Sequence, residues 1–145
     1  MKNKLLGAFL LAFSGIAFAQ GGRSLWHPNA NRGDLNVLPN KTALTKPKLY
    51  SLDEQALRQS LVPANGADRA HAIVMEFPNA DGKFESFRVF EFSNMDPELA
   101  ARYPDIKSYA GQSVDDPSVT IRFSMSPLGF QSMVLYGDRS AVFIE

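Results

Sequence analysis

The sequence predicts an α+β fold: an antiparallel sheet meander with two short helices packed on it, preceded by a signal peptide and an extended arm. Short apolar runs separated by turn residues fill the second half of the chain, as expected for a meander. Ser51–Leu61 and Asp96–Tyr103 each begin with helix-capping residues and end just before or close to a proline. From Val119 to Met125 apolar and polar residues alternate strictly, which is typical of a strand with one buried face.

The N-terminus has the parts of a secretory signal peptide. Two lysines follow Met1, Leu5–Phe18 is apolar, and Ala17-Phe18-Ala19 is a small-x-small cleavage motif. We therefore predict that residues 1–19 are a signal peptide cleaved between Ala19 and Gln20, and that the mature protein is secreted. The apolar run is too short to span a bilayer comfortably and no second one follows it, so we expect no membrane association after signal removal.

Residues 20–48 are predicted to form an extended or loosely ordered arm, because Gly, Asn, Pro and Lys are frequent and the apolar residues keep no period. Trp26 is the candidate anchor of this arm. Residues 49–145 are predicted to form the α+β domain. Its first helix is expected to begin in a capping box. In it the Ser51 side chain accepts a hydrogen bond from the backbone N–H of Glu54, and the Glu54 side chain accepts one from the backbone N–H of Ser51.

The strands and the second helix follow in order along the domain. The helix Asp96–Tyr103 starts with a capping Asp, a Pro and an acidic residue. In the second strand Phe87 and Val89 face one way and Phe90 and Phe92 the other, so we expect its later half to be covered on both sides. The expected strands are His71–Phe77, Phe84–Phe92, Ile106–Val114, Val119–Met125, Phe130–Tyr136 and Ala141–Ile144. Because the last of them is apolar almost to Glu145, we expect the domain to be truncated at its C-terminal end.

Composition and motifs exclude several functions. Lys+Arg and Asp+Glu number 15 each, so the charge gives no reason to expect a nucleic-acid partner. The chain has no cysteine, which excludes disulfides and thiolate zinc sites. His27, expected to be solvated, and His71, expected to be partly buried at a strand start, lie far apart in sequence and outside any Glu-x-x-His arrangement. Asp115 and Asp116 precede a proline and are interpreted as turn residues. We predict no catalytic, metal-binding or cofactor-binding residue in this chain.

Residues 73–145 resemble the pro-regions of secreted bacterial reprolysin-like zinc metallopeptidases. The segments that carry the resemblance are Met75–Val89, Met95–Ala100, Tyr103–Tyr109, Asp116–Ser124 and Gly129-Phe130. The family order is signal peptide, pro-region and zinc catalytic domain. The resemblance therefore implies a non-catalytic pro-region that assists folding of the protease and inhibits it until proteolysis removes the pro-region. Its partner would be the catalytic domain of the same precursor, which would hold the zinc. Without a cysteine to supply a thiolate, inhibition would act by covering the cleft, or through an oxygen or imidazole ligand.

An alternative from another class is a free-standing exported adhesion or carbohydrate-binding module. Three tyrosines on one exposed face, Tyr103, Tyr109 and Tyr136, would favour this alternative. A small exported hydrolase is disfavoured, since no serine lies in a Gly-x-Ser-x-Gly elbow and no base accompanies a nucleophile.

Overall fold

A computed structural model describes residues 25–29, 47–66 and 69–145, and the statements below concern these residues. Its main element is a six-stranded antiparallel sheet in which each strand pairs with the next one along the chain, in the order β3-β4-β5-β6-β7-β8. The strands are β3 (Ile73–Pro78), β4 (Phe84–Glu91), β5 (Lys107–Ser113), β6 (Thr120–Ser126), β7 (Gly129–Leu135) and β8 (Val142–Ile144). Together with two short helices this sheet confirms the predicted α+β meander.

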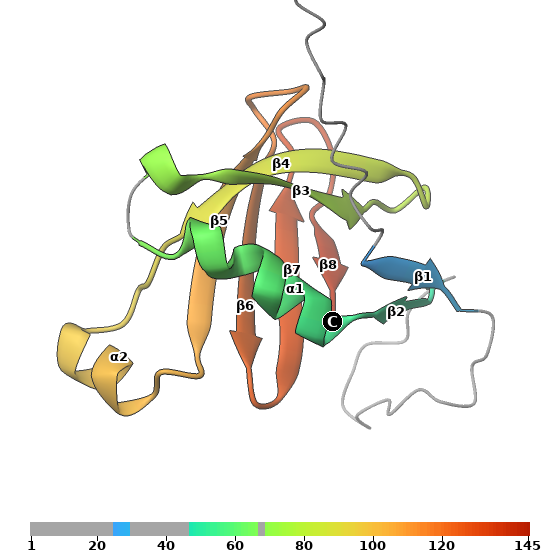
Figure 1. Ribbon diagram of the computed structural model, residues 1–145. Coiled ribbons are helices and arrows are strands. Elements are labelled where there is room, and N and C mark those ends of the chain that lie inside the picture. The colour runs from blue at the N-terminus through green and yellow to red at the C-terminus, as the bar shows by residue number, and fades with distance from the viewer. Residues whose placement is uncertain (1–24, 30–46, 67–68) are drawn as a thin grey trace, which may run out of the picture.

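The sheet is strongly curled. β3 and the adjoining part of β4 run across the direction of β6 and β7 rather than alongside them (Figure 1). At the middle of the meander, Gly111 in β5 leaves no room for a side chain. A Cβ atom there would lie 2.7 Å from Val89 Cγ1 and 2.8 Å from Ile121 Cγ2. A glycine at this position therefore lets the neighbouring strands approach closely on the concave side.

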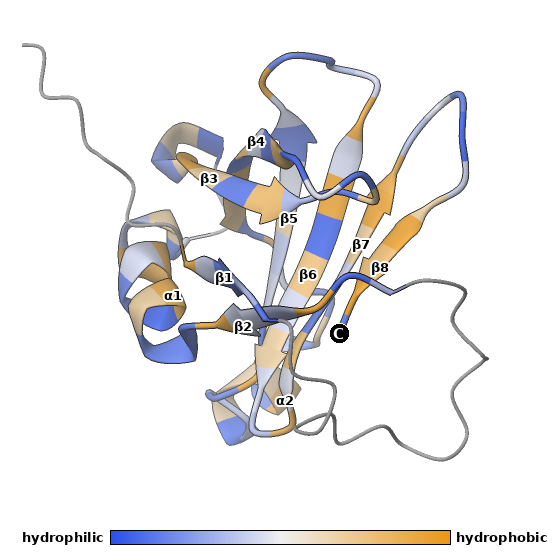
Figure 2. Cartoon of the chain, turned by 90° about the vertical axis from the view of Figure 1, so that its right-hand side faces the viewer, coloured by the Kyte–Doolittle hydropathy of each residue, from blue (hydrophilic) through white to orange (hydrophobic). Residues whose placement is uncertain are grey.

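The two faces of the sheet differ in composition. Along β6 hydrophobic and hydrophilic residues alternate (Figure 2). Ile121, Phe123 and Met125 are buried, whereas Arg122 between them is exposed. The concave face therefore carries the core. The opposite side of the sheet, called the outer face below, carries the alternate residues.

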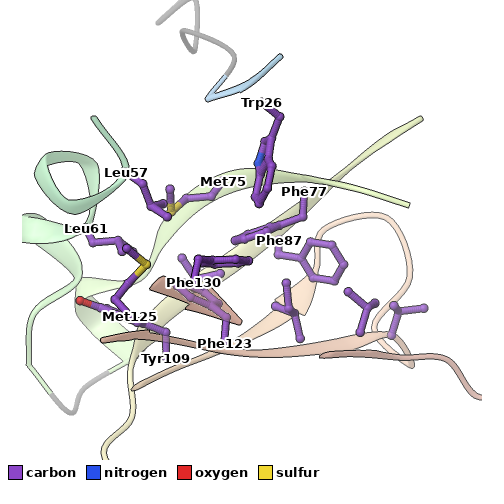
Figure 3. Packing of buried hydrophobic residues seen from close by; sticks show 14 residues of the cluster. Trp26, Leu57, Leu61, Met75, Phe77, Phe87, Tyr109, Phe123, Met125 and Phe130 are labelled. Atoms are coloured by element: carbon purple, nitrogen blue, oxygen red, sulfur yellow. The ribbon is translucent and has the colours of Figure 1, made fainter. Parts of the chain in front are cut away.

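The concave face is covered by α1 (Glu54–Leu61) and by the small sheet of β1 (Trp26–Pro28) and β2 (Tyr50–Leu52). Leu57 and Leu61 of α1 are each 1% exposed and point towards the sheet, where two methionines lie near them (Figure 3). Beneath the small sheet the core is built mainly from aromatic rings in mutual contact: Trp26, Phe77, Phe87, Tyr109, Phe123 and Phe130.

Trp26 is the anchor that the sequence predicted for the arm. Its side chain is only 4% exposed, and its ring meets that of Phe130 edge-on at a centroid distance of 5.4 Å. Its Nε1–H donates a hydrogen bond to the backbone oxygen of Glu76 (3.0 Å). Because β3 is at the edge of its sheet, this bond gives a partner to a backbone carbonyl on the open side of the strand. At the end of β3, Pro78 has no backbone N–H group that would need a partner.

Helix α1 begins later than predicted. Its N-cap is Asp53, whose Oδ1 accepts a hydrogen bond from the backbone N–H of Ala56 (2.9 Å). The expected capping box at Ser51 is therefore wrong. Ser51 instead lies in β2 opposite His27 of β1, so pairing with a distant segment fixes it in an extended conformation.

Helix α2 (Pro97–Arg102) begins as predicted, with Asp96 Oδ1 accepting a hydrogen bond from the N–H of Glu98 (2.9 Å). It contains no buried residue and lies in the connection between β4 and β5. The helical contribution to the core thus comes from α1 and from the 3₁₀ turn Val62–Ala64 that follows it, whose Ala64 is fully buried. No described helix is long and apolar enough to cross a membrane.

Two expectations for the strands need correction. The strand predicted from His71 begins only at Ile73, because Arg69–His71 forms a 3₁₀ turn, and His71 is exposed rather than partly buried. In β4 the residues Phe87 and Val89 are fully buried, but Phe92 just beyond the strand is 39% exposed. The second face of this segment is therefore only partly covered. The other predicted strands are confirmed to within a residue or two at each end.

Candidate functional site

The outer face of the sheet carries a shallow hollow of about 460 Å³, called the outer hollow below. Cross-strand pairing builds it from two parallel rows of side chains, since residues directly opposite each other on neighbouring strands share a face. One row is Arg122, Met133 and Phe143, and the other is Ser108, Ser124 and Gln131. Phe92 and Asn94, which follow β4, border the hollow on one side.

Two charged residues line the outer hollow, Arg122 and Glu145, and Arg122 lies between the polar row and apolar neighbours. Its guanidinium carbon lies 4.6 Å from the centre of the Phe92 ring, a cation–π geometry. Within the described part of the chain, its side chain forms no ion pair or hydrogen bond. The hydrogen-bonding capacity of the guanidinium is therefore free for a ligand.

The polar row beside Arg122 is also free. Among residues 25–29, 47–66 and 69–145 no hydrogen-bond partner is found for the side chains of Ser108, Ser124 or Gln131. Ser108 and Ser124 are half-buried, and Gln131 is exposed. The hollow thus combines a guanidinium, two hydroxyls and an amide on one side with exposed apolar groups on the other. Such a surface can accept an anionic group that has apolar neighbours.

A second polar group of residues, around Glu85, is fully engaged within the protein. Tyr136 Oη donates to Glu85 Oε2 (2.8 Å), and Asn79 Nδ2 donates to Glu85 Oε1 (2.9 Å). Arg139 reaches the same carboxylate at 3.4 Å and lies over the Tyr136 ring at 3.8 Å. Burial, together with the hydrogen bond to Glu85, raises the pKa of Tyr136 to about 12. This network ties the β3–β4 hairpin to the β7–β8 connection and is structural.

A third polar group surrounds Glu91 at another part of the curled sheet. Lys107 Nζ lies 2.7 Å from Glu91 Oε1, and the backbone N–H of Gly66 donates to Oε2 (3.1 Å). Nearby, Tyr109 Oη donates to Asn65 Oδ1 (3.4 Å). Burial, and secondarily the negative charge of Glu91, raises the pKa of Tyr109 to about 12. These contacts hold the connection after α1 against the sheet.

The residues singled out in the sequence are distributed as follows. The predicted cleavage pair, Ala19 and Gln20, lies outside the described residues. His27 is exposed in β1, as expected. Asp115 and Asp116 are exposed in the turn between β5 and β6. Among the described residues no group of three or more His, Cys, Asp or Glu side chains could hold a metal ion.

Asp116 acts as a turn residue, as the sequence predicts. Its Oδ1 accepts hydrogen bonds from the Ser118 hydroxyl (2.7 Å) and from the Ser118 backbone N–H (2.9 Å). These bonds favour the ionised carboxyl and lower the pKa of Asp116. The carboxylate is therefore occupied in shaping the turn.

The three tyrosines that would favour a carbohydrate-binding module do not share a face. Tyr109 is 4% exposed and points into the core, where its ring stacks on Phe123. Tyr136 is bound to Glu85, and Tyr103 is exposed at the end of α2. These three tyrosines therefore do not form the shared exposed face that would favour this alternative.

Comparisons of the chain with protein-family models, with curated proteins and with solved structures find no match. Sequence reasoning did not identify the outer hollow. The alternation from Val119 to Met125 places Arg122 and Ser124 on a solvent face, but their neighbours are determined by the pairing of β6 with β5 and β7.

Proposed function

We propose that this chain is the pro-region of a secreted zinc metalloprotease, exported by the signal peptide at residues 1–19. It would act on the catalytic domain of the same precursor, as an intramolecular folding aid and inhibitor. The observation that carries the proposal is the position in the fold of the segments that resemble metallopeptidase pro-regions. They coincide with the turns, caps and strands that determine the course of the meander.

The β3–β4 hairpin illustrates this correspondence. Asn79 Oδ1 accepts hydrogen bonds from the backbone N–H groups of Asp81 and Lys83, both at 3.0 Å. Gly82 has φ of +80°, a conformation that glycine adopts without strain. Residues 78–82, which read Pro-Asn-Ala-Asp-Gly, thus form a hairpin turn whose residue types suit the backbone conformation of the turn. Resemblance at turn residues of this kind supports a shared fold. A pro-region without catalytic residues would share its fold with the family, and not a catalytic motif.

The fold suits an intramolecular partner. A domain with its own core can present a formed surface to a protease domain on the same chain, and the tether supplies a high effective concentration. Several apolar side chains remain exposed to make such a contact. Leu128, at the turn between β6 and β7, is 98% exposed, and Phe143 in β8 is 64% exposed. Since the chain has no cysteine, the proposed inhibition covers the cleft without a thiolate ligand.

The test is to produce the metallopeptidase domain of the precursor with and without residues 20–145. We expect the domain made alone to give less soluble, active protease. The pro-region added in trans should slow peptide cleavage and form a complex detectable by gel filtration. Inhibition in trans should be weaker than in the intact chain, because the tether is lost.

A pair of variants in β6 provides the control for this experiment. Phe123→Ala should unfold or loosen the domain and abolish both effects, whereas Ser124→Ala, its neighbour in the same strand, should leave the fold intact. The proposal is wrong if no complex forms at high micromolar concentration and the protease domain also folds equally well without residues 20–145.

A further inference from the structure

We propose that the outer hollow binds an extended peptide segment in which one Asp or Glu side chain is flanked by apolar residues. The site is formed by Arg122 with the neighbouring polar row and by the exposed apolar side chains beside it. This inference goes beyond the proposed function, because it assigns a ligand chemistry to this surface whether or not the partner is a protease.

The first step is the state of Arg122. One side of its guanidinium is held by the Phe92 ring at 4.6 Å, while no described side chain forms an ion pair with it. A guanidinium presents a fork of N–H donors that matches the two oxygens of a carboxylate. Stacking on an aromatic ring leaves this fork available at the edge of the group. A carboxylate is therefore the ligand group that the Arg122 guanidinium complements.

The second step is the polar row. Ser108 and Ser124 face each other across β5 and β6, and Gln131 faces Ser124 across β6 and β7. Their side chains offer further N–H and O–H donors, in the row of cross-strand neighbours next to that of Arg122. A carboxylate has enough lone pairs to accept from the guanidinium and from a neighbouring hydroxyl or amide together. The row therefore strengthens the preference for an acidic group.

The third step is the apolar border. Phe92 is 39% exposed and Phe143 is 64% exposed, and Met133 lies between Arg122 and Phe143 in the register. Apolar side chains that lie next to the ligand carboxylate would cover these groups. Exposed apolar surface rimmed by polar residues is typical of protein interaction sites.

The fourth step distinguishes a peptide from other carboxylates. The hollow is shallow and lies on one layer of the sheet, so it cannot enclose most of the surface of a small molecule. A peptide instead gathers contacts over several strands. The hollow offers a single guanidinium to a negative charge, so it favours one acidic side chain over a polyanion such as nucleic acid.

The test is a nuclear magnetic resonance titration of the isotope-labelled protein with two defined peptides, acetyl-Leu-Phe-Glu-Leu-Val-amide and the same peptide with Gln in place of Glu. We expect saturable amide shifts centred on Arg122, Ser124 and Met133 with the Glu peptide. The Gln peptide should bind about tenfold more weakly, because it lacks the charge-assisted bond. Arg122→Gln should weaken binding of the Glu peptide by a similar factor.

Arg88→Gln is the matched control, because Arg88 is an exposed arginine of β4, two strands away from β6, and does not line the hollow. This variant should bind the Glu peptide as the unaltered protein does. Both variants should retain the spectrum of the folded protein. The proposal is overturned by any of four results: no saturable shifts at millimolar peptide, equal binding of the two peptides, equal weakening by Arg88→Gln, or the same shifts and affinity with acetate alone.

Discussion

Replacing Trp26 by alanine tests whether the segment around residues 25–29 belongs to the folded domain. The side chain is 4% exposed, meets Phe130 edge-on at 5.4 Å and lies 6.1 Å from Phe77. Removing a large aromatic side chain from such a site costs about 3–5 kcal/mol. Domains of this size are stable by about 5–15 kcal/mol, so Trp26→Ala should remove a large part of the free energy of unfolding.

Trp26→Phe separates packing from hydrogen bonding at the same position. It keeps an aromatic ring in the core but removes the donor to the Glu76 carbonyl, a partly buried bond of 3.0 Å. We expect a smaller loss, about 1–2 kcal/mol. Urea unfolding should be followed by far-ultraviolet circular dichroism, since Trp26 is the only tryptophan and its fluorescence is lost in both variants. A cost below about 0.5 kcal/mol for Trp26→Ala would show that the arm is not anchored and refute the reasoning.

Three further predictions concern the core and the buried tyrosines. Gly111→Ala places a Cβ 2.7 Å from Val89 Cγ1, so it should cost about 1–3 kcal/mol in urea unfolding, and unchanged stability would contradict the close approach. Ser132 is 6% exposed and its hydroxyl has no hydrogen-bond partner among the described residues, so Ser132→Ala should be neutral or stabilising by up to about 1 kcal/mol, whereas a clear loss would reveal a missing bond. The pKa values of Tyr109 and Tyr136 are raised from 10.0 to about 12, so their neutral forms are favoured in the folded state. Their stabilising contribution is therefore complete below pH 10 and is lost as the pH rises towards 12, and a flat urea midpoint over this interval would count against it.

Local backbone chemistry explains why much of the fold was predictable. The caps and turns at Asp96, Asn79 and Asp116 each bond a backbone or side-chain group within four residues, so their residue types suffice to locate them. The alternation in β6 was equally informative, because one face of that strand is buried. Ser51 was misassigned for the opposite reason. Its conformation is set by pairing with His27, and no local pattern reports a pairing over that distance.

Non-local contacts account for the rest of what was missed. β1 and β2 have three residues each, too few for a hydrophobic period to appear. The bond from Trp26 to Glu76 spans 50 positions of sequence. The sequence did suggest Trp26 as an anchor, since a lone tryptophan in a polar segment is a large apolar group that needs a place to pack. It could not indicate the edge of β3 as that place.

The outer hollow could not be predicted because three independent features of the fold assemble it. Alternation turns Arg122 outward, the register of β5, β6 and β7 places the polar row beside it, and the path of the chain after β4 brings Phe92 to the guanidinium. Arg122, Phe92 and the polar row themselves are not part of the core, which lies on the concave face. Substitutions such as Arg122→Gln should therefore leave the free energy of unfolding within about 0.5 kcal/mol of the original value. Because the two faces can be altered separately, a loss of peptide binding by this variant would report on recognition and not on folding.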